Sequence, residues 1–381
     1  MGLSRVKSFR GEQGFNMTKP IDCCDVLILG SVPLSGPEEV FVGIASSLGK
    51  RVRRMPDGET GPRLEWIFWQ KQIFERNSSF LSGAKDEASS TDWRNQAVDE
   101  KLRLWSNWYH LRPEIHADDL EFGKLGYANE AKKSYEIFSR LKTQGAIDAS
   151  CKFQVSLPTP YCVLGACVAP ESRLRTERAY EARLISEILE ITDAIPADEL
   201  AIQWDAAHEI ENLDGARPHW FEDPEAGIVE RLVRLGEAVP RQVELGYHFC
   251  YGDFAHRHIV EPVDMGTMVR VANEVSKSIN RPVQWLHMPV PKDRKDLSYF
   301  EPLRQLRLQP STRLYLGVVH YTDGFEGAME RIKVAHKIRR DFGIATECGF
   351  GRRAPDTVPL LLDIHKKVCD SMSAASVSAC T

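Results

Sequence analysis

The sequence predicts an α/β fold, namely a (β/α)8 TIM barrel with a helical insertion between its second and third strands. Three observations lead to this prediction. Eight short apolar runs are spread along the chain, their spacing leaves room for crossover helices, and each run ends in polar or glycine-bearing residues. Eight such units that close on themselves form a barrel. An open doubly wound sheet is the alternative, but no GxGxxG loop follows the first run.

The elements follow in order. Apolar residues recur with a helical period over 38–49 and 177–191, which predicts a helix in each segment. The long connection 62–150 predicts the insertion. The eight predicted strands cover residues 26–31, 53–59, 153–160, 200–206, 244–253, 283–290, 314–321 and 343–350.

The expected domain organisation is simple. Residues 1–24 form an N-terminal extension, 25–368 the barrel, and the small polar residues of 369–381 a disordered tail. The insertion is rich in charge and aromatic residues, and we interpret it as a lid or a dimer surface, or as ordinary helix packing. Its aromatic residues include Trp66, Trp69, Trp105, Trp108 and Tyr109.

Composition narrows the class of partner. The chain has 381 residues, of which 43% are hydrophobic, and a formal net charge of −5, which gives no reason to expect a nucleic acid or an anionic membrane as partner. It contains no apolar run long enough for a membrane helix and no secretory signal, so a cytoplasmic location is expected. An odd number of cysteines, nine, argues for reduced thiols rather than a disulfide framework.

One short stretch, HFCYGDF, points to chemistry. Alternation along a strand places His248 and Cys250 on the same face, as two ligands of one metal ion would be arranged. If the barrel forms, His287 and Cys348 from later strand ends reach the same mouth. Two thiolates and two imidazoles suit tetrahedral Zn²⁺. Packing of unrelated buried side chains is the other interpretation.

Several segments resemble the cobalamin-independent methionine synthases. HFCYGDF resembles the family's HMCYSDF motif, ECGFGRR its DCGLKTR motif, and LAIQWDAAHEIE its IQIDEPALRE segment. LILGSVP is similar to TTIGSFP, and DGETGPRLEWIFW to HGEFERNDMVEYF. The matches lie in the same order over about 25–355 and cover only the family's C-terminal catalytic barrel. In that respect the chain is closer to the short archaeal enzymes and to the barrel of uroporphyrinogen decarboxylase and epoxyalkane–coenzyme M transferase.

The resemblance implies a zinc site. His248, Cys250 and Cys348 occupy the positions of family ligands, and His287 falls where the family has a glutamate ligand. This departure removes one negative charge, which makes the site a stronger Lewis acid and its bound thiolate less nucleophilic. A histidine that only lines the barrel beside Trp285 is the alternative for His287. Asp253 would orient His248, as metal-binding histidines usually require.

The resemblance also implies an amino acid pocket. Asp205 and Glu59 match contacts to the substrate ammonium group, and Ser31 a contact to its carboxylate. The family's proline after the aspartate is absent, and Trp204 and His208 are expected to make the pocket bulkier and more basic, so homocysteine is not the expected substrate. A helix N-cap is the structural alternative for Asp205.

Two further groups are candidates at this mouth. His320 stands where the family has an aspartate, near Asp323, and could act as a general acid or base, although a hydrogen-bonded rim residue is equally compatible with the sequence. Arg352 and Arg353 could meet an anionic substrate group, or lie on the surface.

The sequence is compatible with three functions. The first is zinc-dependent alkyl or methyl transfer to an activated thiol. The second is a zinc lyase or isomerase acting on a small carbonyl metabolite, with His320 or His208 moving protons. The third is a non-catalytic barrel protein. A small molecule is the expected ligand in the first two, and a homodimer is compatible with all three.

Overall fold

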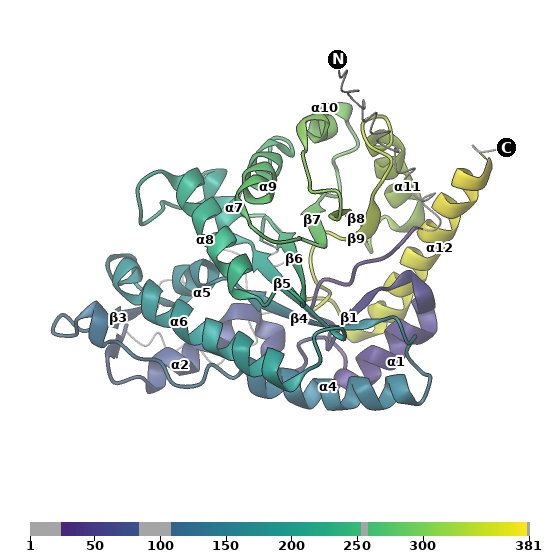
Figure 1. Cartoon of the computed structure of the whole chain (residues 1–381). Coiled ribbons are helices and arrows are strands. Elements are labelled where there is room, and N and C mark those ends of the chain that lie inside the picture. Colours follow the sequence, from purple (N-terminus) through teal and green to yellow (C-terminus); the bar gives the residue numbers. More distant parts are fainter. Residues whose placement is uncertain (1–23, 84–107, 253–257, 379–381) are drawn as a thin grey trace, which may run out of the picture.

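The computed structural model describes residues 24–83, 108–252 and 258–378. Its main element is a seven-stranded parallel sheet with the strand order β1-β4-β5-β6-β7-β8-β9. The sheet is curled, and helices lie around the outside of its strands (Figure 1). The strands are β1 (Arg54–Pro56), β4 (Lys152–Pro158), β5 (Leu200–Ala206), β6 (Glu244–Phe249), β7 (Trp285–Pro289), β8 (Arg313–Val319) and β9 (Gly343–Thr346).

The first apolar run lies between the two edges of this sheet. Val26 forms isolated bridges with Val52, just before β1, and with Ile344 in β9. The backbone N–H of Val26 donates to the carbonyl of Arg51, and that of Leu27 to the carbonyl of Ile344. The segment predicted as the first strand therefore contacts both edges without being a regular strand itself. The fold is TIM-barrel-like, with seven of the eight predicted strands present.

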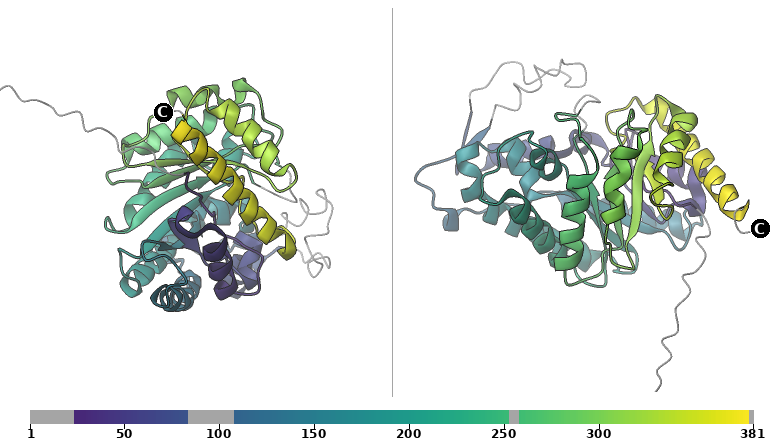
Figure 2. Two further views of the ribbon diagram at one scale, coloured as in Figure 1. Left: turned by 90° about the vertical axis from the view of Figure 1, so that its right-hand side faces the viewer. Right: turned by 90° about the horizontal axis from the view of Figure 1, so that it is seen from above.

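The outer layer consists of helices that connect successive strands. The predicted helices 38–49 and 177–191 are confirmed as α1 and as part of α6. Helices α1 and α12, from opposite ends of the described chain, pack together (Figure 2). The helices are α1 (Pro37–Leu48), α2 (Lys71–Arg76), α4 (Tyr127–Thr143), α5 (Pro160–Cys167), α6 (Pro170–Ala194), α7 (His208–Leu213), α8 (Pro224–Ala238), α9 (Gly266–Ser278), α10 (Leu297–Phe300), α11 (Gly324–Ala335) and α12 (Val358–Ser378).

The segment between β1 and β4 is mixed rather than purely helical. It contains the 3-10 helix η2 (Gly61–Gln70), helices α2 and α4, and a small antiparallel sheet of β2 (Phe80–Ser82) and β3 (Tyr109–Leu111). The start of α4 is held by Glu187 of α6, whose carboxylate accepts from the backbone N–H groups of Leu125 and Ala128 at 2.8 and 2.7 Å. A buried carboxylate thus satisfies donors that a helix N-terminus leaves unpaired.

The sheet has its own interior cluster. Buried side chains of the strands form it, and it is separate from the larger core between the sheet and the helices. Trp285 is its largest member. A side chain at Gly246 on the neighbouring strand would collide with the indole, so this glycine is required by packing. The cluster consists of Leu27, Leu29, Ala201, Trp285, Tyr315 and Ala345.

The structure corrects the predicted disordered tail. Residues 369–378 continue helix α12, and Cys369 and Met372 are buried. Their apolar side chains pack against Cys24, so burial outweighs the small polar residues around them. Among the described residues, none of the helices is both long and apolar enough to span a bilayer.

Candidate metal centre and substrate pocket

A pocket lies at the carboxyl ends of the strands. Its walls come from segments far apart in sequence: the loop after the first apolar run, the loop after β1, and the ends of β5, β6 and β9. This is the edge at which barrel enzymes place their active sites. The polar and aromatic residues that line it are Ser31, Glu59, Trp66, Asp205, His248, Cys250, Cys348 and Arg352.

The pocket carries a possible metal site. Ligand atoms of His248, Cys250 and Cys348 all lie within 4.8 Å of one another. His248 belongs to β6 and Cys250 follows two residues later, so alternation turns both side chains the same way. Cys348 arrives from the loop after β9. The sequence prediction that these three residues converge agrees with the structure.

The donor set fits a metal ion. Two sulfurs and one imidazole are ligands that zinc accepts, and they are mostly shielded from solvent. A hydrogen bond from Cys250 holds the pKa of Cys348 well below its usual value, and contacts with His248 and Arg352 act in the same direction against the effect of burial. A low pKa favours the thiolate, which is the form that binds metals.

His287 is adjacent to this group but is not a member of it. It pairs with His248 across β6 and β7, and the Nδ1 atoms of the two rings are 2.7 Å apart. Its other nitrogen, Nε2, lies 3.0 Å from the carbonyl oxygen of Thr346. The ring is fully buried, and burial lowers its pKa well below the ordinary value, with a further contribution from His248. The structure thus brings all four predicted side chains together but gives His287 a hydrogen-bonding position.

The same pocket carries two carboxyl groups, Glu59 and Asp205. Burial raises the pKa of Glu59 to about 8, against the attraction of Arg63. Burial, and then the charge of Glu59, raise the pKa of Asp205 well above its usual value. Gln203 donates to Asp205 at 2.9 Å, but no cation among the described residues forms an ion pair with Glu59 or Asp205. Arg63 and Arg352 act to lower the pKa of Glu59, but burial outweighs them. These two buried carboxyls therefore form an environment suited to a cationic ligand group.

Two pocket residues have unusual backbone conformations. Glu59 has φ 48° and Trp66 has φ 53°, both in the left-handed region that non-glycine residues rarely adopt. Such outliers tend to occur where a side chain must be aimed at a ligand. The Ser31 hydroxyl accepts from the backbone N–H of Gly351 at 3.3 Å, so the first loop and the last loop of the fold meet here.

Trp204 is not a pocket residue, which corrects the sequence prediction. It alternates with Asp205 along β5, so the indole points to the opposite side of the sheet from the carboxylate. Its Nε1 donates to the carbonyl of Leu235 in α8 at 3.2 Å, and the side chain is fully buried in the helix layer. Trp204 therefore does not enlarge or crowd the substrate site.

His208 also lies outside the pocket lining. Its Nε2 is 3.7 Å from a carboxylate oxygen of Glu211, and its ring meets Trp66 edge-on. Burial lowers its pKa well below the ordinary value. The predicted increase in pocket bulk and basicity from Trp204 and His208, which was part of the expectation against homocysteine, is therefore not supported.

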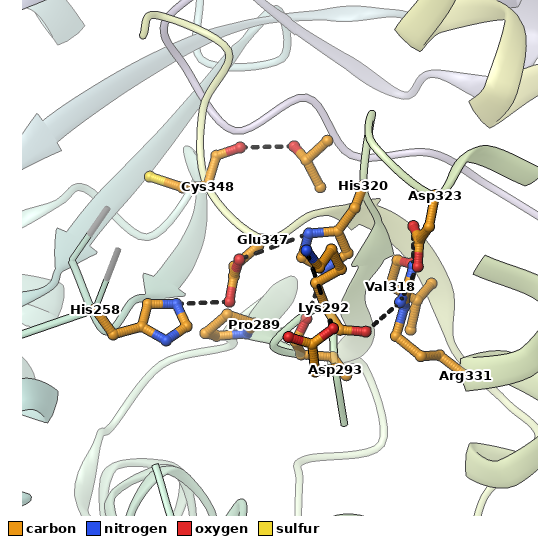
Figure 3. A network of polar contacts seen from close by, with 12 residues as sticks. His258, Pro289, Lys292, Asp293, Val318, His320, Asp323, Arg331, Glu347 and Cys348 are labelled. Carbon is orange, nitrogen blue, oxygen red and sulfur yellow. Dashed lines mark hydrogen bonds and ion pairs between the residues drawn. The ribbon is translucent and has the colours of Figure 1, made fainter. Parts of the chain in front are cut away.

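A second polar network lies beside Cys348. Figure 3 shows Glu347 between His258 and His320. His258 is 2.8 Å from one carboxylate oxygen of Glu347, and Nδ1 of His320 is 3.7 Å from the other. Burial disfavours a charged His258, but the hydrogen bond and charge of Glu347 outweigh it and raise the pKa to about 9. Neither His258 nor Glu347 was identified from the sequence, because only the fold brings them together.

His320 differs from the expected acid or base. Its Nε2 donates to the carbonyl of Val290 at 2.8 Å, and burial lowers its pKa to about 4. Figure 3 shows Asp323 in a separate contact with Arg331, at 2.7 Å. His320 is thus neutral near pH 7 and lies outside the pocket lining. It agrees with the hydrogen-bonded alternative more closely than with a group that titrates near neutral pH, but the side chain is buried and does not lie at the rim.

Of the other residues that the sequence suggested for the site, some line the pocket and others lie outside it. Arg352 lines the pocket with Nη1 3.9 Å from the sulfur of Cys348, whereas Arg353 lies over the ring of Tyr321. Trp66, predicted as part of a lid, dimer surface or helix packing, lines the pocket. Asp253 and Trp105 lie outside the described residues.

Comparison with known proteins supports the fold. The sequence matches no protein-family model and no curated protein. A B12-independent methionine synthase from Shewanella sp. W3-18-1, in complex with selenomethionine, is 12% identical with a TM-score of 0.54 over 93% of this chain and 99% of that chain. A protein assigned as a vitamin-B12-independent methionine synthase from Listeria monocytogenes is also 12% identical, with a TM-score of 0.51 over 88% and 86%.

A methyltransferase from Methanosarcina mazei is 13% identical with a TM-score of 0.46 over 92% of this chain and 95% of that chain. The two methionine synthase structures match most of the chain at low sequence identity, and the predicted resemblance is confirmed for the fold. The chain therefore has the fold of the B12-independent methionine synthases, with a His/Cys/Cys group that could hold a metal ion at the carboxyl ends of its strands.

Proposed function

We propose that the protein is a zinc-dependent transferase that moves an alkyl group, most simply methyl, to the sulfur of a small thiol that carries an ammonium group. The observation that carries this proposal is the distribution of groups in one pocket. Side chains that could hold a metal ion and two buried carboxyls with raised pKa values line the same pocket. A small aminothiol has the two functional groups that such a pocket would bind.

Different residues of the pocket would bind different parts of the substrate and the metal ion. Glu59 and Asp205 would hold the ammonium group, whose positive charge would stabilise the ionised form of these buried carboxyls. Ser31, on the same wall, would contact a substrate carboxylate if one is present. His248, Cys250 and Cys348 would hold zinc, which lowers the pKa of a bound thiol while leaving the sulfur nucleophilic. Trp66 would cover the pocket and limit access of water.

The alternatives have less support. A lyase or isomerase in which His320 or His208 moves protons has less support, because both histidines lie outside the pocket lining. A non-catalytic barrel protein would not require a pocket with two buried carboxyls, a left-handed backbone at Glu59 and two neighbouring thiols. Because Trp204 and His208, which were part of the argument against homocysteine, lie outside the pocket lining, homocysteine is a reasonable first test substrate.

Zinc-edge X-ray absorption of the zinc-loaded protein tests this proposal. With homocysteine added, we expect one additional sulfur in the metal shell. With 2-mercaptoethanesulfonate, an anionic thiol without an ammonium group, we expect no change at the same concentration. Methylated thiol should then form when a simple donor such as methyl iodide is supplied, faster than without protein. An unchanged shell with homocysteine, or equal responses to both thiols, would refute the proposal.

A further inference from the structure

His287 and His248 form a directed hydrogen-bond chain behind the metal group. The two rings meet through their Nδ1 atoms at 2.7 Å, and Nε2 of His287 continues the chain to the carbonyl oxygen of Thr346 at 3.0 Å. His287 is 0% exposed and His248 is 5% exposed. Water therefore has little access to these hydrogen bonds.

The carbonyl group of Thr346, at the end of this hydrogen-bond chain, indicates where the protons lie. A carbonyl oxygen only accepts, so Nε2 of His287 must carry a proton. A second proton on Nδ1 would make a fully buried imidazolium, and none of the described carboxylates forms an ion pair with His287. In a neutral His287 the Nδ1 atom is then the lone-pair acceptor, and the proton in the 2.7 Å contact belongs to Nδ1 of His248. This leaves Nε2 of His248 as the nitrogen with a lone pair for a metal ion.

The surrounding strands are shaped for this chain of contacts. The imidazole of His287, on β7, reaches across β8 to Thr346 on β9, and it passes Gly317 on the way. A Cβ atom at Gly317 would lie 3.0 Å from Nε2 of His287 and 2.7 Å from the oxygen of Thr346. The absence of a side chain there leaves space for the hydrogen bond.

From this geometry we infer that His287 is a positioning residue and not a metal ligand: it accepts the proton of His248 Nδ1 and thereby fixes the tautomer and the orientation with which His248 binds the metal. Metal-binding histidines generally donate their second N–H to a fixed acceptor, and His287 is that acceptor here. The inference rests on the proposed zinc site and specifies its ligands. The protein would supply two sulfurs and one nitrogen, which would leave the fourth position of a tetrahedral zinc ion for the substrate sulfur.

The wild-type protein provides the first test. Zinc-edge absorption of the zinc-loaded protein without thiol should fit two sulfurs, one imidazole and one light oxygen or nitrogen atom. A fit that requires two imidazoles would overturn the inference. In the zinc-loaded protein labelled with ¹⁵N-histidine, a long-range ¹H–¹⁵N correlation spectrum should show His287 protonated at Nε2 only. A spectrum with His287 protonated at Nδ1 would equally overturn it.

Matched variants provide the second test, with zinc affinity measured by competition with a coloured chelator. His287→Leu removes the acceptor and should weaken zinc binding about 10- to 100-fold while retaining one equivalent at saturation. His287→Asn keeps an acceptor oxygen near the position of Nδ1 and should recover most of that loss. His365→Leu removes another fully buried histidine, in α12, and should leave zinc affinity unchanged. Equal affinities for wild type and His287→Leu would contradict the inference.

These outcomes separate the inference from the proposed function. A shell with one imidazole and no alkyl transfer would retain the role of His287 and refute the reaction. A shell with two imidazoles together with alkyl transfer to homocysteine would do the reverse.

Discussion

Substitution of Glu59 by glutamine should change how the stability of the protein depends on pH. Burial raises the pKa of this carboxyl from 4.5 to about 8. Between these values the folded state holds a proton that the unfolded state has released. The contribution of Glu59 to stability is therefore fully present below about pH 4.5 and is lost as the pH rises through about 8. Glutamine cannot titrate and removes this dependence.

The size of the effect follows from the two pKa values. One pKa unit corresponds to about 1.4 kcal/mol. The part of the titration between pH 6 and pH 9 amounts to about 2–3 kcal/mol when the unfolded carboxyl is already ionised. The free energy of unfolding of the wild type should therefore fall by about 2–3 kcal/mol more than that of Glu59→Gln over this range.

Urea denaturation at pH 6 and pH 9, followed by tryptophan fluorescence, measures this difference. A chelator should be present throughout, so that metal binding does not contribute to stability. Glu136→Gln, an exposed substitution on α4, controls for the general loss of one carboxylate. If wild type and Glu59→Gln lose the same free energy of unfolding, Glu59 does not hold a buried proton, and the proposed ammonium site loses its main electrostatic support.

Three further predictions concern the metal, the substrate and the fold. Cys348→Ser should lower bound zinc from about one equivalent to less than about 0.1 by elemental analysis, whereas Cys151→Ser should retain the metal; zinc retained in the first variant would contradict the site. Asp205→Asn should lower kcat/KM for an aminothiol about 10- to 100-fold in a methylation assay, because a charge-assisted hydrogen bond is lost; an unchanged value would exclude Asp205 from the pocket's function. Glu187→Ala should lower the free energy of unfolding by about 3–5 kcal/mol in urea titrations, since Arg183 and the start of α4 lose a buried partner; a change below about 1 kcal/mol would show that this network does not stabilise the fold.

The sequence predicted most of the sheet because parallel strands leave a strong local pattern. Residues 200–206 were predicted as a strand and form β5 with the same bounds. The convergence of His248, Cys250 and Cys348 was also predictable, since strand alternation and barrel topology determine where these side chains point. Alternation alone also indicates that Trp204 and Asp205 face opposite sides, and the prediction that both contact the substrate overlooked this.

Other features depend on contacts that a linear pattern does not contain. The position of His287 depends on Gly317 and Thr346 of two other strands, so the sequence could place it near the metal but not distinguish a ligand from a hydrogen-bond acceptor. The tail was predicted as disordered from its small polar residues, whereas buried Cys369 and Met372 anchor it as helix.

Anomalous X-ray diffraction at the zinc edge, from crystals of the zinc-loaded protein, tests the central claim most directly. We predict one strong peak at the carboxyl ends of the strands, within about 2.0–2.3 Å of the sulfurs of Cys250 and Cys348 and of Nε2 of His248. The absence of such a peak, or a zinc ion bound elsewhere in the molecule, would contradict the account.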